Sequence, residues 1–271
     1  MKKSNFFLNN IIASSLAIIF LTFSGHTVAL AASAEEKGLE IAREMEKRDT
    51  GWQNFKAELT MILKNRQGEK STRHLRAKTL ENPTDGDKTL MIFDSPRDVK
   101  KTAFLTISHK YDDDDQWLYL PALKRVKRIS SANKGGAFMG SEFSYEDMSP
   151  PIVEKFTYTH LRDETYKGRP CYIIERYPID KRSLYNKHVV WIDKEQYVPW
   201  KIEYYNRRNK HLKTLIYRKY KRYLKEFWRP GEMYMVNLRT KKNTILAWKN
   251  YIFHINASDS DFSPQVLTRA Q

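Results

Sequence analysis

FKAELTMILK, residues 55–64, places an apolar residue at every second position. The apolar series is Phe55, Ala57, Leu59, Met61 and Leu63, and mostly polar residues stand between its members. Successive side chains of a β-strand point to opposite faces of a sheet, so a series with period two indicates a strand with one buried face. The segment is therefore predicted to be a half-buried strand.

The same period returns along most of the remaining chain. Leu75 and Ala77 alternate with charged residues after a turn at Arg66-Gln67-Gly68, and Asp85-Gly86 marks a further turn. Further strands are predicted at residues 89–93, 102–107, 116–120, 156–161, 172–177, 188–192, 200–205, 211–219, 233–238, 244–248 and 251–255. Many short strands with few helical intervals predict a mainly β protein whose antiparallel sheet curls into a barrel or half-barrel.

One helix is predicted ahead of the strands, at residues 35–48. Leu39, Ile41, Ala42 and Met45 recur there with roughly helical spacing between charged residues. The segment Asp49-Thr50-Gly51 then interrupts the pattern.

The first residues have the order of a secretory signal peptide. Lys2 and Lys3 precede a short apolar run at residues 11–23, and Ala29-Leu30-Ala31 and Ala32-Ser33-Ala34 offer two cleavage sites. An uncleaved anchor is the alternative, although the run is shorter than the ~20 residues of a membrane span. We expect a signal peptide over residues 1–34, a mature protein that begins at Ala32 or Glu35, and a single domain over residues 35–271.

The chain carries a formal net charge of +16, and residues 181–229 hold much of the excess. Basic and aromatic residues interleaved in this way would indicate nucleic acid in an intracellular protein. Export removes that partner, so anionic lipid head groups are the expected polyanion, and an anionic membrane surface the expected contact. A solvated sheet face is the alternative.

No catalytic, cofactor or metal-binding motif is found in the sequence. His-Glu-x-x-His, Cys-x-x-Cys, Gly-x-Ser-x-Gly and the phosphate-binding Gly-x-x-x-x-Gly-Lys-Ser/Thr are all absent. The only cysteine, Cys171, opens an apolar run and is expected to be a small buried side chain. The acidic run at residues 112–115 lacks the spacing of a calcium loop and is expected to be a solvated hairpin tip. We therefore expect no enzyme, no cofactor and no metal site.

Two stretches carry a resemblance to a known family. QWLYLPALKRVKRIS (residues 116–130) and FMGSEFSYEDM (residues 138–148) closely resemble the signature of the bacterial outer-membrane lipoprotein-sorting protein family, a branch of the LolA/LolB-like superfamily. DTGW (residues 49–52), LTM (59–61) and WRP (228–230) agree with it. Lys101 departs from it, because many relatives have Gly there.

The resemblance implies a fold and a role. The implied fold is a curved antiparallel sheet that forms an incomplete barrel, with an N-terminal helix and a lid of loops or helices over its open side. The implied role is a periplasmic acceptor or shuttle for lipids or lipoproteins that works with a transporter of the resistance-nodulation-division (RND) type.

A carrier needs an apolar lining, because burying each methylene of an acyl chain contributes ~0.8 kcal/mol. The candidate lining is the set of residues predicted to face inward, although plain core packing would give the same pattern. They are Leu59, Met61, Leu63, Leu75, Ala77, Met91, Phe93, Trp117 and Tyr119.

Two further groups complete the candidate site. Phe138, Met139, Phe143 and Met148 lie in a glycine-containing segment and are candidates for a mobile lid, because Met and Phe adapt to a flexible ligand. Lys124, Arg125, Lys127 and Arg128 are candidates for contact with anionic lipid or an acidic partner.

Three hypotheses follow for the function. The first is a lipid or lipoprotein carrier. The second is an adaptor or envelope-stress sensor that binds a transporter or lipoprotein without moving it. The third is an enzyme that acts on envelope lipid.

Overall fold

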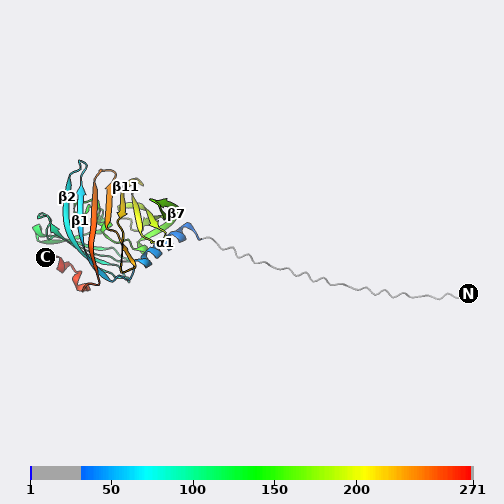
Figure 1. Cartoon of the computed structure of the whole chain (residues 1–271), viewed down its shortest axis with the longest axis horizontal. Helices are drawn as coiled ribbons and strands as arrows, with labels where there is room; N and C mark the ends of the chain where they lie inside the picture. The colour runs from blue at the N-terminus through cyan, green and yellow to red at the C-terminus, as the bar shows by residue number, and fades with distance from the viewer. Residues whose placement is uncertain (2–31, 270–271) are drawn as a thin grey trace. The chain divides into compact units, whose positions relative to one another are not determined.

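The computed structural model describes Met1 and residues 32–269, and β-strands are its main element (Figure 1). Residues 2–31, which hold most of the predicted signal peptide, lie outside the described residues. The strands are β1 (Asn54–Lys64), β2 (Lys70–Leu80), β3 (Lys88–Ser95), β4 (Ala103–Ile107), β5 (Asp115–Leu120), β6 (Arg125–Ile129), β7 (Phe156–Tyr166), β8 (Arg169–Pro178), β9 (Tyr185–Asp193), β10 (Pro199–Asn206), β11 (His211–Arg218), β12 (Lys221–Tyr223), β13 (Phe227–Arg229), β14 (Glu232–Asn237) and β15 (Asn243–Phe253).

Two α-helices and six single 3-10 turns complete the described chain. The α-helices are α1 (Ala34–Arg48) and α2 (Pro264–Leu267), and the turns are η1 (Pro121–Leu123), η2 (Ser131–Asn133), η3 (Phe138–Gly140), η4 (Glu146–Met148), η5 (Val153–Lys155) and η6 (Asp259–Asp261). No helix among the described residues has the length and apolarity that a membrane crossing requires.

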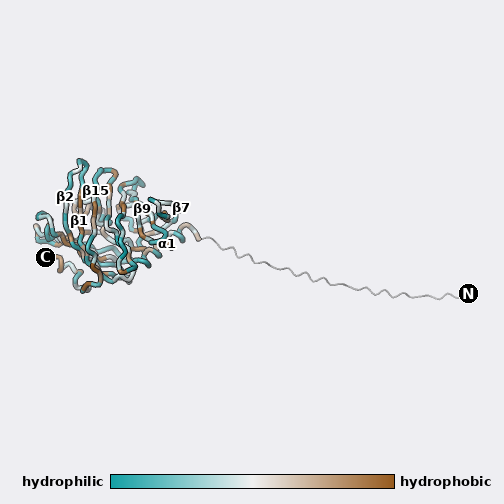
Figure 2. The backbone as a smooth tube through the Cα atoms, in the orientation of Figure 1, coloured by the Kyte–Doolittle hydropathy of each residue, from teal (hydrophilic) through white to brown (hydrophobic). Residues whose placement is uncertain are grey.

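Thirteen strands form one antiparallel sheet, in the order β6-β5-β4-β3-β2-β1-β15-β14-β11-β10-β9-β8-β7. β6 and β7 are its two edges and do not pair with each other, so the sheet is not closed. Figure 2 shows hydrophobic and hydrophilic residues interleaved along its strands. The prediction of a mainly β protein with an open, antiparallel sheet is confirmed.

The two edge strands are neighbours in sequence but lie at opposite ends of the strand order. The segment that joins them, residues 130–155, is here named the connecting loop. It has to pass from one edge to the other, and its Phe138 and Phe143 pack into the main core cluster with Leu59 and Val190. The loop therefore covers one face of the sheet, which we call the inner face.

The outer face of the sheet is covered in part by the C-terminal segment, whose Phe262 and Leu267 pack on Leu90 and Leu105. Cys171 is fully buried on this face, and burial raises the pKa of its thiol to about 11. The prediction of a small buried side chain at Cys171 is confirmed.

Helix α1 begins with a capping box, because Ser33 and Glu36 hydrogen-bond each other's backbone N–H groups at 3.1 and 2.8 Å. It lies beside β7 (Figure 1). At the contact, a Cβ on Gly38 would stand 2.9 Å from backbone atoms of Thr159 and His160. The predicted helix at residues 35–48 is confirmed, and it begins one residue earlier.

Three strands were not predicted, and one prediction was divided wrongly. β6 and β12 are rich in Lys and Arg and have too few apolar residues to show a period of two. β13 has only three residues, which is too short to show one. Residues 244–248 and 251–255 were predicted as separate strands, but β15 runs through Asn250, whose φ of 55° marks a local irregularity.

Candidate functional site

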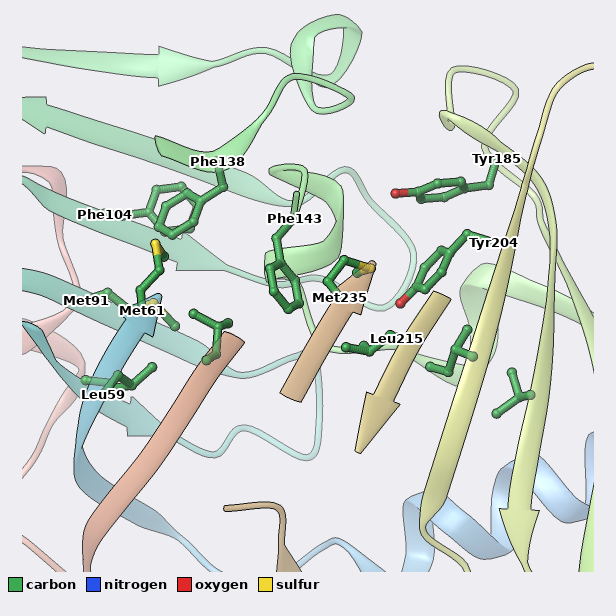
Figure 3. Close-up of a cluster of buried hydrophobic side chains, with 14 of the residues drawn as sticks. Leu59, Met61, Met91, Phe104, Phe138, Phe143, Tyr185, Tyr204, Leu215 and Met235 are labelled. Carbon is green, nitrogen blue, oxygen red and sulfur yellow. The ribbon is translucent and has the colours of Figure 1, made fainter. Parts of the chain in front are cut away.

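The inner face of β1–β5 is filled by side chains of the chain itself. Leu75, Met91 and Phe93 are 2%, 4% and 0% exposed and belong to one core cluster with Phe138. The ring centroids of Phe104 and Phe138 lie 4.9 Å apart (Figure 3). We call this region the packed half of the inner face. The inward orientation predicted for Leu59, Met61, Leu63, Leu75, Ala77, Met91 and Phe93 matches their place in or against this cluster.

Trp117 and Tyr119 do not belong to this inner set. They pack on the outer face with Leu105 and the C-terminal Phe262, and it is Leu118 that faces the inner core. The prediction that both aromatic residues line the inner face is therefore wrong. β5 is covered on both faces, so its apolar residues do not alternate with polar ones. The sequence pattern therefore does not show which residues of β5 face inward.

The predicted lid residues lie in the connecting loop and plug the packed half. Phe138 and Phe143 are 0% and 1% exposed, and Phe143 points toward Met235 of β14 (Figure 3). Met139 and Met148 are half-buried against the same cluster. A side chain with almost no exposed surface is part of the core and does not cover an open cavity.

A buried ion pair ties the connecting loop to the sheet. Asp147 of the loop pairs with Lys213 of β11, and their side chains are 2% and 4% exposed. The Tyr185 hydroxyl donates to Asp147 Oδ1 at 2.7 Å, and Lys213 Nζ donates to the Glu142 carbonyl at 3.0 Å. Removing one partner of a buried pair costs about 3–5 kcal/mol, so the loop apex is firmly anchored.

A first cavity of about 400 Å³ lies between the connecting loop and the strands β8–β11 and β14. Its walls combine apolar residues with tyrosines: Ile202, Tyr204, Leu215, Tyr217 and Met233. Tyr111 and Ile179 also line it and are 84% and 58% exposed. These two side chains give the rim of the cavity an apolar part at the protein surface, beside charged residues such as Asp112 and Arg182.

A second cavity of about 940 Å³ lies between α1 and the inner face of β8–β10. Ala42 and Met45 of the helix and Ile174, Val190 and Ile192 of the strands line it. We call the inner face of β7–β11 the hollow half, because both cavities are formed there. None of the predicted lining or lid residues lines either cavity.

The two cavities share part of their walls. Lys110, Pro150, Pro151, Arg176 and Tyr217 line both of them. Their volumes lie within the range of about 300–1,000 Å³ that is usual for small-molecule sites. The hollow half therefore offers space for a ligand that the packed half does not.

The hydroxyl groups of the hollow half stay protonated at neutral pH. Burial raises the pKa of Tyr217 to about 12 and that of Tyr204 well above its ordinary value. Burial, with the nearby cations Arg176 and Lys213, lowers the pKa of His188 well below its ordinary value. These side chains therefore present neutral hydrogen-bonding groups.

The four basic residues proposed for an anionic partner lie at one edge of the sheet. Lys124, Arg125, Lys127 and Arg128 are exposed on or next to β6, and Arg128 pairs with Asp115. Charges on an edge strand also prevent pairing with other sheets. Their contact with an anionic surface stays a prediction.

The acidic run 112–115 is neutralised by separate basic side chains. Asp113 pairs with Arg182, and Asp114 pairs with Lys155. Among the described residues no group of three His, Cys, Asp or Glu side chains is placed to hold a metal ion.

Arg176 is a cavity residue that the sequence reasoning missed. It follows Tyr172 and Ile174 on the inward positions of β8. A charged residue in phase with buried apolar neighbours is the signal that marks it, because such a group needs a reason to face inward.

The comparisons with known proteins agree with this architecture. A family model described as "Uncharacterized protein" matches residues 85–269. A crystal structure assigned to an outer membrane lipoprotein-sorting protein domain from Vibrio parahaemolyticus is 52% identical, with a TM-score of 0.85, over 87% of this chain and 100% of that one. A DUF1329 family protein from Desulfovibrio piger is 29% identical, with a TM-score of 0.82, over 87% and 100% of the two chains.

A more distant structure shows the fold alone. A LolA superfamily protein from Nitrosomonas europaea is 18% identical, with a TM-score of 0.67, over 86% of this chain and 98% of that one. No curated protein matches the chain in sequence. The name of the 52% identical relative describes a sorting protein and no enzyme. The resemblance found in the sequence is confirmed: the chain belongs to the outer membrane lipoprotein-sorting protein family.

Proposed function

We propose that this protein carries a lipid, or the acyl chains of a lipoprotein, in the two cavities of the hollow half. The observation that carries the proposal is the pair of adjoining cavities with apolar walls, one of which has an exposed apolar rim at Tyr111 and Ile179. The sorting function in the name of the 52% identical relative supports it.

The energetics of acyl burial favour a carrier that hands its cargo over directly. Each buried methylene contributes ~0.8 kcal/mol, so a chain of about 15 methylenes prefers the cavity over water by roughly 12 kcal/mol. Release into water would lose most of this energy. A partner with its own apolar site therefore has to receive or supply the cargo.

The place of action is proposed to be the periplasm, after export by the predicted signal peptide. A transporter of the RND type is proposed as the partner. The basic residues Lys124, Arg125, Lys127 and Arg128 are proposed to guide the protein toward an anionic membrane surface. Genomic adjacency to a lipid exporter, followed by co-purification with it, tests the partnership.

The packed half contributes to binding only if the connecting loop moves. Leu59, Met61 and Phe93 would contact an acyl chain only after Phe138 and Phe143 had left their present positions. The hollow half requires no such movement.

Native mass spectrometry of protein purified from the cell envelope tests the carrier proposal. We expect co-purified acyl lipid at near one-to-one occupancy. Met233→Trp, which adds volume at the wall of the first cavity, is expected to lower this occupancy. Leu123→Trp adds the same volume at an exposed turn and is the matched control.

Two results would contradict the proposal. One is a folded wild-type protein that carries no lipid and takes up none when it is added. The other is equal lipid occupancy in Met233→Trp and Leu123→Trp.

A further inference from the structure

Arg176 lies where the two cavities meet. It stands on β8 between Ile174, which lines the second cavity, and Pro178, which lines the first. Its partners on the neighbouring strands are Tyr158 of β7 and His188 of β9. Any ligand that extends from the surface rim into the second cavity passes this residue.

The contacts of its guanidinium group are all uncharged. Arg176 Nε donates to His188 Nδ1 at 3.0 Å, and the guanidinium carbon lies 4.7 Å from the centroid of the Phe156 ring. Among the described residues no carboxylate oxygen lies within 4.0 Å of its nitrogen atoms. The cation therefore has no ion-pair partner within the described part of the chain.

His188 supplies no negative charge. Its Nδ1 accepts from Arg176, so a neutral ring carries its proton on Nε2, and that atom is buried without a hydrogen-bond partner. The side chain is 4% exposed. Its lowered pKa keeps it neutral at physiological pH.

Several enclosed cations of this protein are paired with carboxylates. Lys213 pairs with Asp147, Lys134 with Asp180, and Arg229 with Asp49. A charge taken out of water is costly unless it is paired.

Arg176 has no such partner. It shares this with other half-buried cations among the described residues. Among them are Arg73, which donates to the Met139 carbonyl and lines neither cavity, and Lys110, which also lines both cavities.

The nearby acidic residues do not neutralise it. Glu154 lines the first cavity and Glu46 the second, and neither is within ion-pair distance of Arg176. Burial and the charge of Glu154 raise the pKa of Glu46. The space in front of the guanidinium can therefore receive an anion that comes from outside the chain.

We propose that Arg176 binds the anionic head group, a carboxylate or phosphate, of an acyl lipid whose chain lies in the second cavity against Ile174 and Val190. This inference rests on the proposed carrier function. A guanidinium group binds both carboxylate and phosphate through two parallel hydrogen bonds. Tyr217, which also lines both cavities and stays protonated, is placed to add a hydroxyl donor.

The arrangement gives the two cavities different tasks. The second cavity is larger and is roofed by Ala42 and Met45, so it holds the acyl chain. The first cavity leads from the exposed rim at Ile179 to Arg176 and serves as the entry route. Cargo with an anionic head group is selected over cargo with a neutral one.

A pair of ligands that differ only in charge tests the proposal. Hexadecanoic acid and hexadecan-1-ol are titrated against delipidated wild-type protein that holds a fluorescent hydrophobic reporter. We expect the acid to displace the reporter at a concentration roughly tenfold lower than the alcohol, because only the acid gains a charge-assisted contact. Inorganic phosphate alone is expected to displace nothing.

Three variants assign the preference to Arg176. In Arg176→Met the acid is expected to bind no better than the alcohol, while the alcohol binds as in the wild type. Arg176→Lys is expected to restore part of the preference. Arg218→Met removes an arginine on the same sheet that lines neither cavity and pairs with Glu232, and it is expected to keep the full preference.

The outcomes separate this inference from the carrier function. Equal binding of acid and alcohol by the wild type overturns the role of Arg176 and leaves the carrier function intact. Failure of both ligands to displace the reporter overturns the carrier function itself. Displacement by inorganic phosphate would show a site for a free anion, which also overturns the lipid head-group assignment. If Arg176→Met does not fold, the comparison of acid and alcohol binding by the wild type and by Arg176→Lys still tests the proposal.

Discussion

The packed and hollow halves of the inner face are built from the same kind of strand, yet only one of them contains space. In the packed half, Phe138 descends from the connecting loop onto Phe104, and Phe143 descends beside Met235 (Figure 3). In the hollow half, the loop and α1 cover tyrosines and branched aliphatic residues without filling the volume beneath them.

The difference shows that an alternating pattern specifies which face is buried and not what buries it. The apolar face of a strand has to be covered by another part of the chain. The covering segment either fills the volume over the strand with aromatic side chains or leaves a cavity beneath it. The polar residues separate the two cases. Lys213 and Asp147 lie at the boundary between the packed half and the hollow half. Arg176 lines the cavities of the hollow half.

The largest expected effect is on the plug. Phe138→Ala is expected to lower the free energy of unfolding by about 3–5 kcal/mol, because the loop is anchored and the site collapses poorly around the lost ring. Denaturant unfolding measures it. Phe156→Ala, beside the first cavity, is the matched control and is expected to cost less than half as much. Equal losses would remove the distinction between the halves.

Overpacking offers the reverse test on two methionines in one row of the sheet. Met61 and Met233 both pair with Leu246, on opposite sides of β15. Met61 is 0% exposed, so Met61→Trp is expected to cost about 1–3 kcal/mol. Met233→Trp is expected to cost under ~1 kcal/mol, because its ring can enter the first cavity. Thermal and denaturant unfolding of both variants would show whether the order is reversed.

A half-buried carboxyl in the wall of the second cavity gives a pH dependence. Burial raises the pKa of Asp87 from its ordinary 3.8 to about 6. The folded state therefore holds this proton more tightly than the unfolded state, and Asp87 lowers stability as pH rises from about 4 to 6. Asp87→Asn, which keeps an oxygen for the Asn82 N–H, is expected to be more stable than the wild type by about 2 kcal/mol at pH 7.5 and equal to it near pH 4.

Asp85 of the same turn is the control of opposite sign. A hydrogen bond from His109 is the main cause that lowers its pKa. Its contribution to stability is present above its ordinary pKa and is lost as pH falls through the lowered value. Asp85→Asn is therefore expected to lose stability at neutral pH. Unfolding curves from pH 4 to 8 that showed the same sign for both variants would contradict this assignment.

The smallest expected effect concerns the roof of the second cavity. In a chain that begins at Ala32, one of the two expected starts, Ser33→Ala removes one half of the capping box of α1 and is expected to cost about 1 kcal/mol. Ser33→Asp keeps an acceptor for the Glu36 N–H and is expected to cost much less. Hydrogen exchange within α1 reports the effect locally. An unchanged exchange rate in Ser33→Ala would mean that packing on β7 alone holds the helix.

The sequence was sufficient for the architecture wherever one face of a strand meets water. β1 shows this, because the apolar residues from Phe55 to Leu63 alternate with mostly polar ones and the predicted phase agrees with the structure. It was not sufficient for β5, where Trp117 and Leu118 are both covered and the pattern cannot tell inside from outside.

The candidate site was harder to predict, because a cavity depends on how side chains from distant parts of the sequence pack together. The pattern of a single strand does not show this packing. Apolar residues such as Met61 and Ile192 look alike in sequence, but only Ile192 borders a space. The neighbour that decides the matter is distant in sequence: Phe138 for the packed half and Met45 for the hollow half. Arg176 could have been identified from the sequence, since its charge interrupts the series of apolar residues at the inward positions of β8.

The position of β15 affects how the sheet is completed during folding. The last strand of the chain sits between β1 and β14, in the interior of the strand order. Until residues 243–253 arrive, the strands that precede them form two separate meanders, each with an unsatisfied edge. The two cavities lie over the second meander, which is formed by β7–β11 and β14. The plug, Phe138 and Phe143, packs on strands of both meanders. Completion of the sheet therefore requires β15 to insert between β1 and β14, and a chain that stops before Asn243 would leave two unpaired strand edges at the centre of the sheet.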